Sequence, residues 1–292
     1  MTDGTLCQSD LGRLVVRCPD QAGIIAAVSG FLFEHGANIV HSDQHSTDPT
    51  GGRFFLRIEF ALANLEAKLP ALRRHFAEVA AIYRMDARFS ATPERRRVAI
   101  FVSREDHCLI ELLWRHGAGE IPAELVCVIG NHPELAGVVS PWSIPFHHVP
   151  IDPATKARAE ARQEELLAAY RVELVVLARY MQVLSPQFVA AWHGRAINIH
   201  HSFLPAFAGA RPFHQASVRG VKLIGATAHY VTGELDAGPI IDQDVHRVDH
   251  RHDVADLRRI SRQIERTVLA RAVTWHLEDR VLIDGNRTIV FS

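Results

Sequence analysis

The chain has 292 residues, of which 48% are hydrophobic and 22% are charged, and its net charge is -1 with an isoelectric point of about 7.0. This length can bury one large core or two modest ones, and we expect two domains. A nearly neutral chain lacks the single-sign field that attracts nucleic acid or anionic lipid, which excludes both as expected partners. The N-terminus carries no secretion signal and no apolar run could span a bilayer, so we expect a cytoplasmic protein.

Residues 10–92 predict a ferredoxin-like βαββαβ domain. An apolar strand at Arg13–Cys18 leads into a helix that we expect Asp20 to cap and Gly36 to end. Residues 53–60 alternate charged with apolar side chains, which is typical of a half-buried strand.

Residues 93–97 are polar and basic and form the predicted linker to a second domain at 98–292. There, short continuous apolar runs alternate with helical segments, as expected for strands that are buried on both faces. The predicted strands are 98–103, 125–129, 144–149, 174–177, 196–200, 226–231 and 240–245, and a helix at 254–277 and a hairpin around 284–286 follow them. This order predicts an α/β fold with a doubly wound, mostly parallel sheet.

Asn198 and His200 stand at the end of the predicted strand 196–200. In an open α/β sheet, ligands bind beyond the carboxyl ends of the strands, and residues two apart share a face. The two side chains can therefore reach one substrate together. From the spacing alone, a structural pair that holds the next loop is equally acceptable.

The segment Asn198–Pro205 resembles the NIHxSxLP signature of folate-dependent formyltransferases and hydrolases, and Glu234–Pro239 resembles their second signature. Three longer stretches, Leu177–Gln182, His201–Phe207 and Gly225–Val231, are similar to the formyltetrahydrofolate deformylases in particular. The resemblance implies an enzyme that hydrolyses 10-formyltetrahydrofolate to tetrahydrofolate and formate. It further implies a role in purine synthesis and one-carbon balance, with the folate and water as partners and no cofactor.

By the same resemblance, the catalytic residues are Asn198, His200 and Asp236. An amide at Asn198 can donate a hydrogen bond to the oxyanion of a tetrahedral intermediate, and an imidazole exchanges protons near neutral pH. Asp236 would orient His200 and hold the attacking water, although Asp-Ala-Gly-Pro is also good turn chemistry. Which of His200 and Asp236 activates the water stays open at this point.

The pterin requires a flat apolar slot with a few hydrogen-bonding groups. Without the resemblance, residues 181–184 would be ordinary core. The resemblance implies a folate pocket lined by Tyr180, Met181, Gln182, Val183, Leu184, Val231, Thr232, Gly233, Glu234 and Leu235.

The turn Ser103–Cys108 favours a hydrolase over a transferase. Related formyltransferases carry a Gly-Ser-Asn phosphate-binding turn here, whereas Glu105 and Asp106 would oppose a phosphate. Two alternatives remain, a formyltransferase to an unphosphorylated amine and a non-catalytic folate or amino-acid sensor. The chain departs from the family at Gly130, where serine is expected, and at 260–265, which lack a Gly-x-Asp-x-Glu pattern.

The segments Cys18–Ile25 and His35–Ile39 resemble the opening of an ACT domain. This implies regulation and a homo-oligomer, either a dimer or a tetramer, with an amino acid as possible effector. Asp20, Gly23 and Asn38 are the candidate effector-binding residues, and helix capping is the alternative role for each.

We predict no metal site. The pairs 147–148 and 200–201 are adjacent histidines whose side chains point to opposite faces of a strand, and no HExxH or Cys/His spacing is present. The four cysteines form no CxxC pair, and we expect Cys108 to be a packed, inert thiol on a helix rather than a nucleophile.

Overall fold

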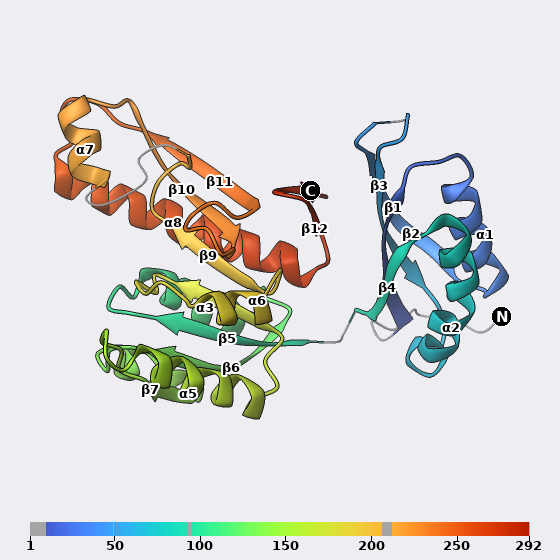
Figure 1. Cartoon of the computed structure of the whole chain (residues 1–292), viewed down its shortest axis with the longest axis horizontal. Coiled ribbons are helices and arrows are strands. Elements are labelled where there is room, and N and C mark those ends of the chain that lie inside the picture. The colour runs from blue at the N-terminus through green and yellow to red at the C-terminus, as the bar shows by residue number, and fades with distance from the viewer. Residues whose placement is uncertain (1–9, 49, 93–94, 206–211, 292) are drawn as a thin grey trace. The chain divides into compact units, whose positions relative to one another are not determined.

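The computed structural model describes residues 10–48, 50–92, 95–205 and 212–291, which form two compact units (Figure 1). The first unit comprises the described residues of Met1–Arg95, Asp279–Leu282 and Ile289–Ser292, and the second comprises Arg96–Glu278 and Ile283–Thr288. Residues near the C-terminal end are thus divided between the two units, whereas the predicted boundary assigns all of 98–292 to one domain.

The first unit is the predicted ferredoxin-like fold. Its sheet is antiparallel throughout, with the strand order β2-β3-β1-β4, and both helices lie on one side of the sheet (Figure 1). The elements are β1 (Leu11–Pro19), α1 (Ile24–Glu34), β2 (Asn38–Ser46), β3 (Arg53–Ala61), α2 (Leu65–Tyr83) and β4 (Asp86–Ala91). Buried side chains from all of these elements except β2 form one apolar core.

The start of α1 differs from the prediction, because Asp20 does not cap it. The N-cap is Gly23, whose φ of 93° lies in the left-handed region that favours glycine, and its carbonyl accepts the first helical hydrogen bond from Ala27. The Asp20 carboxylate instead accepts a hydrogen bond from the Ser46 hydroxyl. The helix does end before Gly36, which has a φ of 74°.

The prediction that β3 is half-buried is wrong. Seven of its nine residues are buried, including Arg57, because β3 lies inside the sheet and its second face is covered as well. Phe55 is fully buried and packs with Leu282 and Phe291 from the end of the chain. The alternation within residues 53–60 carries no information about a contact with residues more than 200 positions further along the chain.

The second unit is built on a seven-stranded sheet with the order β11-β10-β9-β8-β5-β6-β7. The strands β5 to β9 are parallel, and β10 runs antiparallel to both β9 and β11, so the mostly parallel sheet is confirmed. The strands are β5 (Arg96–Val102), β6 (Ala123–Gly130), β7 (Phe146–His148), β8 (Leu174–Ala178), β9 (Ala196–His200), β10 (Leu223–Tyr230) and β11 (Ile240–Arg247).

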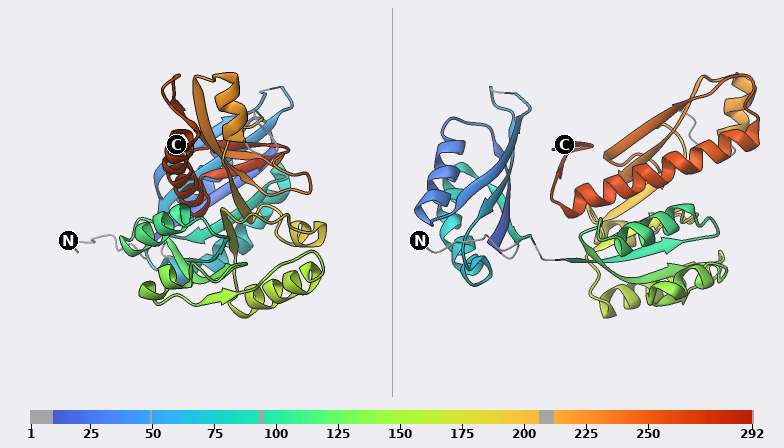
Figure 2. Two further views of the ribbon diagram at one scale, coloured as in Figure 1. Left: turned by 90° about the vertical axis from the view of Figure 1, so that its left-hand side faces the viewer. Right: turned by 180° about the vertical axis from the view of Figure 1, so that it is seen from behind.

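Helices cover both faces of this sheet. The helices are α3 (His107–Gly117), α4 (Ala136–Val139), the 3-10 helix η2 (Ser140–Trp142), α5 (Lys156–Ala169), α6 (Pro186–Ala191), α7 (Pro212–Arg219) and α8 (Val254–Leu277). The long α8 packs along β10 and β11 and against α3 (Figure 2), while α5 and α6 contribute to a core on the other face. A short hairpin of β12 (Val281–Asp284) and β13 (Arg287–Val290) ends the chain.

The strands β6 and β8 pair with opposite edges of β5, so the strand order changes direction at β5. In open α/β sheets, ligands bind at such a topological switch point, beyond the carboxyl ends of the strands. Gly130 ends β6, and a Cβ at this position would lie 2.6 Å from the Phe146 ring. That close approach gives a physical reason for glycine where the family resemblance predicts serine.

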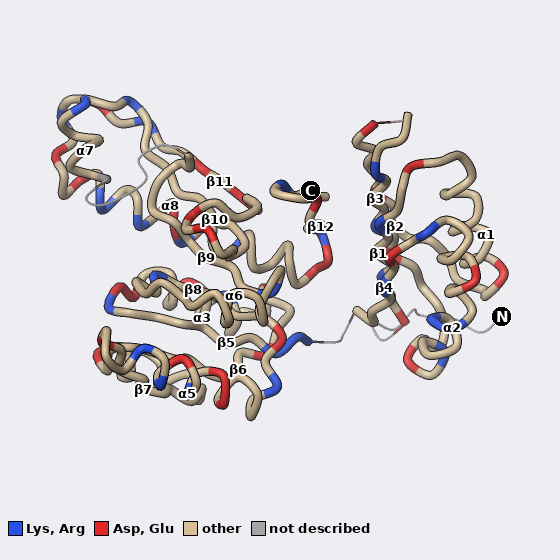
Figure 3. Tube along the Cα trace, in the orientation of Figure 1, with Lys and Arg blue, Asp and Glu red and all other residues tan. Residues whose placement is uncertain are grey.

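Basic and acidic residues are interspersed along both units (Figure 3), in agreement with the near-zero net charge. In the part of the chain that the structure describes, none of the helices has both the length and the apolar character needed to cross a membrane.

Candidate active site

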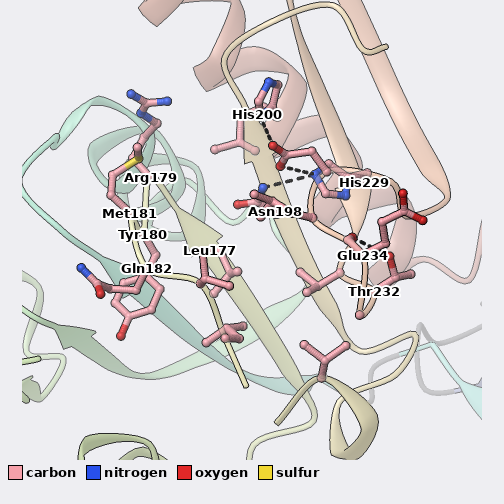
Figure 4. A pocket seen from close by; sticks show the side chains of 18 of the residues that line it. Leu177, Arg179, Tyr180, Met181, Gln182, Asn198, His200, His229, Thr232 and Glu234 are labelled. Carbon is pink, nitrogen blue, oxygen red and sulfur yellow. Dashed lines mark hydrogen bonds and ion pairs between the residues drawn. The ribbon is translucent and has the colours of Figure 1, made fainter. Parts of the chain in front are cut away.

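Asn198 and His200 extend from β9 (Figure 4). Asp236 joins them from the loop that follows β10. The Nδ1 atom of His200 lies 3.2 Å from Oδ2 of Asp236, close enough for the imidazole N–H to donate to the carboxylate. His200 is only 7% exposed, and Asp236 has a φ of 55° in the left-handed region. Aspartate is one of the non-glycine residues that adopt this conformation most readily, and the φ value agrees with the turn in which the Ala237 N–H donates to the Glu234 carbonyl.

His229 is a further member of this group that the sequence reasoning missed. Its Nε2 accepts a hydrogen bond from the Asn198 amide at 3.2 Å, and its Nδ1 donates to the Tyr230 carbonyl at 2.9 Å. Burial lowers the pKa of His229, so the ring is neutral, with its proton on Nδ1. His229 and Asn198 are directly opposite in the antiparallel pairing of β10 with β9, and this register was the missing signal.

The Asp236 carboxyl is ionised at neutral pH, because the hydrogen bond from His200 lowers its pKa further than partial burial raises it. The other ring nitrogen of His200, Nε2, is buried and has no hydrogen-bond partner among the described residues. A buried polar atom without a partner costs stability unless a ligand or water satisfies it. The arrangement can therefore present one imidazole nitrogen and one amide N–H to a reacting carbonyl.

A pocket of about 320 Å³ opens beside these side chains. It is lined by Asn198, His200 and Asp236 together with all ten of the predicted folate-binding residues, Tyr180, Met181, Gln182, Val183, Leu184, Val231, Thr232, Gly233, Glu234 and Leu235. Met181 and Gln182 lie on one side of it and Thr232 and Glu234 on the other (Figure 4). Exposed apolar side chains around a pocket are typical of a binding site, and Met181 and Leu235 are 58% and 69% exposed.

The predicted lining residues do not all contribute equally. Tyr180 is 4% exposed, its hydroxyl accepts a hydrogen bond from Gln163 at 2.8 Å, and its ring packs against Phe101. Its side chain therefore belongs mainly to the core. Arg179 and His201 line the pocket but were not predicted. The prediction that His200 and His201 point to opposite faces is wrong, because β9 ends at His200 and the two rings stack with 5.0 Å between centroids.

The first turn of α3 and the middle of α8 together form a cluster that could be taken for a metal site. His107, Cys108 and Glu265 place potential ligand atoms within 4.8 Å of one another. The Glu265 carboxylate, however, already accepts from His107 at 2.9 Å and from Ser261 at 2.7 Å, and it lies 3.4 Å from Nε of Arg179. Cys108 is fully buried, as predicted, and burial raises its pKa well above that of a free thiol.

The three candidate effector residues do not meet within one chain. Asp20 and Gly23 lie near the start of α1, and Asp20 bonds to Ser46 at one end of β2. Asn38 begins the same strand, so at roughly 3.3 Å per residue it stands about 26 Å from Ser46. A ligand that contacts both ends would need residues of another copy of the chain.

Comparison with known proteins agrees with this architecture. The family model for the ACT domain matches residues 12–77, and the model described as formyl transferase matches residues 96–273. The fold and site thus define an ACT domain joined to a formyltransferase-like domain.

More specific relatives narrow this class. Formyltetrahydrofolate deformylase of Bacillus subtilis (strain 168) is 56% identical over 283 residues, which cover 97% of this chain and 94% of the relative. The crystal structure of a formyltetrahydrofolate deformylase from Pseudomonas syringae pv. tomato superposes with a TM-score of 0.93 at 48% identity, over 97% and 94% of the two chains. Glycinamide ribonucleotide transformylase 1 from Symbiobacterium toebii is more distant, with a TM-score of 0.64 and 32% identity over 70% of this chain and 97% of its own. The chain belongs to the formyltetrahydrofolate deformylase family.

Proposed function

We propose that this protein hydrolyses 10-formyltetrahydrofolate to tetrahydrofolate and formate. The observation that carries the proposal is the apolar pocket of about 320 Å³ that ends on the Asn198, His200 and Asp236 side chains. A pterin fits the slot between residues 180–184 and 231–235, and it then presents its formyl group to the amide and the imidazole.

Asn198 stabilises the oxyanion of the tetrahedral intermediate. One of its amide hydrogens is donated to neutral His229, which holds the side chain in place and leaves the second hydrogen for the substrate oxygen. His229 therefore acts as a positioning residue for Asn198.

His200 and Asp236 work as one acid–base pair. The ionised Asp236 carboxylate holds the Nδ1–H of His200, so that Nε2 is the atom that exchanges protons with the substrate. The water oxygen bonds to the formyl carbon, the C–N bond breaks and the folate nitrogen receives a proton. The products are tetrahydrofolate, a formate anion and one proton released to solvent.

The protein acts without a metal or nucleotide cofactor, and the ion pairs that already satisfy Glu265 support this for the cluster of His107, Cys108 and Glu265. It is a cytoplasmic homo-oligomer, a dimer or a tetramer, whose ACT domain binds an amino acid, and it supplies formate for purine synthesis and balances one-carbon pools. The match to the ACT family model supports the effector site, and the separation of Asp20 from Asn38 requires that a site containing both draw on two copies of the chain.

The test is a product assay in amine-free buffer, in which formate and tetrahydrofolate are quantified together. Equal release of both products is expected. The Asp236→Asn variant should lose about 10²–10⁴-fold in kcat, the usual contribution of general acid–base groups. Asp244→Asn, which removes an exposed carboxylate on β11, is the matched control and should keep full activity. Folate binding without release of formate would contradict the proposal and indicate an amine acceptor.

A further inference from the structure

A second pocket, of about 280 Å³, lies next to the catalytic pocket and has a different lining. Arg179 and His201 line both pockets, and the His201 ring stacks on the His200 ring with 5.0 Å between centroids. The remaining lining is Glu105, His107, Phe213, Arg258, Arg262 and Glu265. The proposed mechanism uses none of these side chains.

The charges of this second pocket are paired, with one exception. Arg262 lies 2.8 Å from Glu105, and Arg179 lies 3.4 Å from Glu265. His201 is neutral, because burial lowers its pKa to about 4. Arg258 has no hydrogen-bond or ion-pair partner among the described residues, so its positive charge is not offset by a carboxylate.

The lining side chains of the second pocket differ in their exposure to solvent. Glu265 and His107 are buried, 2% and 8% exposed, and together with Arg179 they form the floor beside the catalytic group. Arg258 and Arg262 are exposed and stand at the mouth, one turn apart on α8. The pocket therefore extends from two residues shared with the catalytic pocket to exposed guanidinium groups, which bind carboxylates well.

We infer that the second pocket is the formate subsite, which receives the formate anion from the catalytic pocket and releases it past Arg258. This inference rests on the proposed function. Hydrolysis converts a neutral formyl group into a carboxylate while the pterin still fills the catalytic pocket, so the anion needs a separate route. The unpaired cation at the mouth of the second pocket favours the anionic product over the uncharged substrate group.

Formate and folate then occupy different pockets, which predicts their inhibition pattern. With the parent protein, formate should inhibit noncompetitively against 10-formyltetrahydrofolate, because the two can be bound at once. In parallel, the NMR signal of ¹³C-formate should broaden on addition of protein, and tetrahydrofolate should not reverse the broadening. Competitive inhibition, or displacement of formate by tetrahydrofolate, would overturn the inference.

Variants of α8 locate the subsite. Arg258→Gln should raise the inhibition constant for formate about tenfold, as expected for the loss of one charge-assisted hydrogen bond. The matched control is Arg259→Gln, the neighbouring exposed arginine that pairs with Asp256 and does not line the pocket, and it should leave formate inhibition unchanged.

Arg262, the second arginine at the mouth of the pocket, provides a further test of formate binding. Arg262→Gln should also weaken formate binding, because it leaves the Glu105 carboxylate without its partner at the mouth. Equal inhibition constants for Arg258→Gln, Arg262→Gln and the control would overturn the inference. Because the NMR experiment reads formate binding without turnover, it separates this failure from a failure of the hydrolysis proposal.

Discussion

The two pockets that share Arg179 and His201 differ in how they hold charge. The walls of the catalytic pocket are largely apolar, and its polar groups include the neutral ring of His229, the ionised carboxylate of Asp236 and the side chain of Glu234. The second pocket contains three arginines and two glutamates. Apart from the shared Arg179, the first pocket is lined mainly by apolar and neutral polar side chains, whereas the second is lined mainly by charged ones. Substitutions in the catalytic pocket should therefore lower kcat, whereas substitutions in the second pocket should weaken the binding of formate.

The largest effect is expected for Glu265→Gln, which breaks the buried contacts with His107 and Arg179. Loss of one partner from a buried charged pair costs roughly 3–5 kcal/mol, so the free energy of unfolding should fall by about that amount in urea denaturation. The control is Glu165→Gln on α5, whose partner Arg162 is exposed, and the change there should stay below about 1 kcal/mol. Equal losses in both variants would show that the Glu265 network is not structural.

Next in size is Asn198→Ala, which should reduce kcat by about 10²–10³-fold, because one oxyanion donor is removed. The inhibition constant for formate should not change, since Asn198 does not line the second pocket. The exposed amide of Gln187 on α6 offers the control Gln187→Ala, expected to match the parent in both measurements. If Asn198→Ala also lost formate inhibition, the two pockets would have to act as one functional site.

A pH effect is expected at His201, which both pockets share. Its pKa is lowered from an ordinary 6.5 to about 4 in the folded chain, so between these values the unfolded chain binds more protons. Stability from this histidine is complete above pH 6.5 and decreases as the pH falls toward 4, by about 2 kcal/mol between pH 7 and pH 5. Unfolding free energies at these two pH values should differ less in His201→Gln than in the parent. An identical pH dependence would show that His201 is not held neutral.

The smallest effect is expected for His229→Ala. Because this ring positions the Asn198 amide and its Nε2 lies 3.8 Å from the Asp236 carboxylate, beyond hydrogen-bond distance, kcat should fall about tenfold while KM stays the same. His229→Gln can still accept the amide hydrogen bond and should recover part of the loss. A rise in KM with an unchanged kcat would instead place His229 in folate binding.

The sequence predicts most of the fold and the centre of the site, for physical reasons that differ between residues. Alternation along β9 puts Asn198 and His200 on one face, and the resemblance to known signatures adds Asp236. The partnership of His229 with Asn198 depends on the register of β10 against β9, which one sequence does not reveal.

Long-range contacts account for the rest of what the sequence could not predict. Glu265 meets His107 across 158 residues of sequence separation, with no local spacing to reveal the pair. At α1, the prediction of an Asp20 cap failed because the left-handed conformation of Gly23 moves the start of the helix three residues further along the chain. Local helix propensity does not reveal that the Asp20 carboxylate bonds to Ser46 instead of capping the helix.

The cover over Phe55 has a consequence for biosynthesis. Leu282 and Phe291 complete this face of the first unit, yet a ribosome makes them only after the whole of Arg96–Glu278. Domains generally fold as units, with the N-terminal one first during synthesis. Here one apolar face of the nascent sheet stays uncovered until Leu282 and Phe291 have been made, so a polypeptide stalled before them would expose Phe55 to chaperones and proteases.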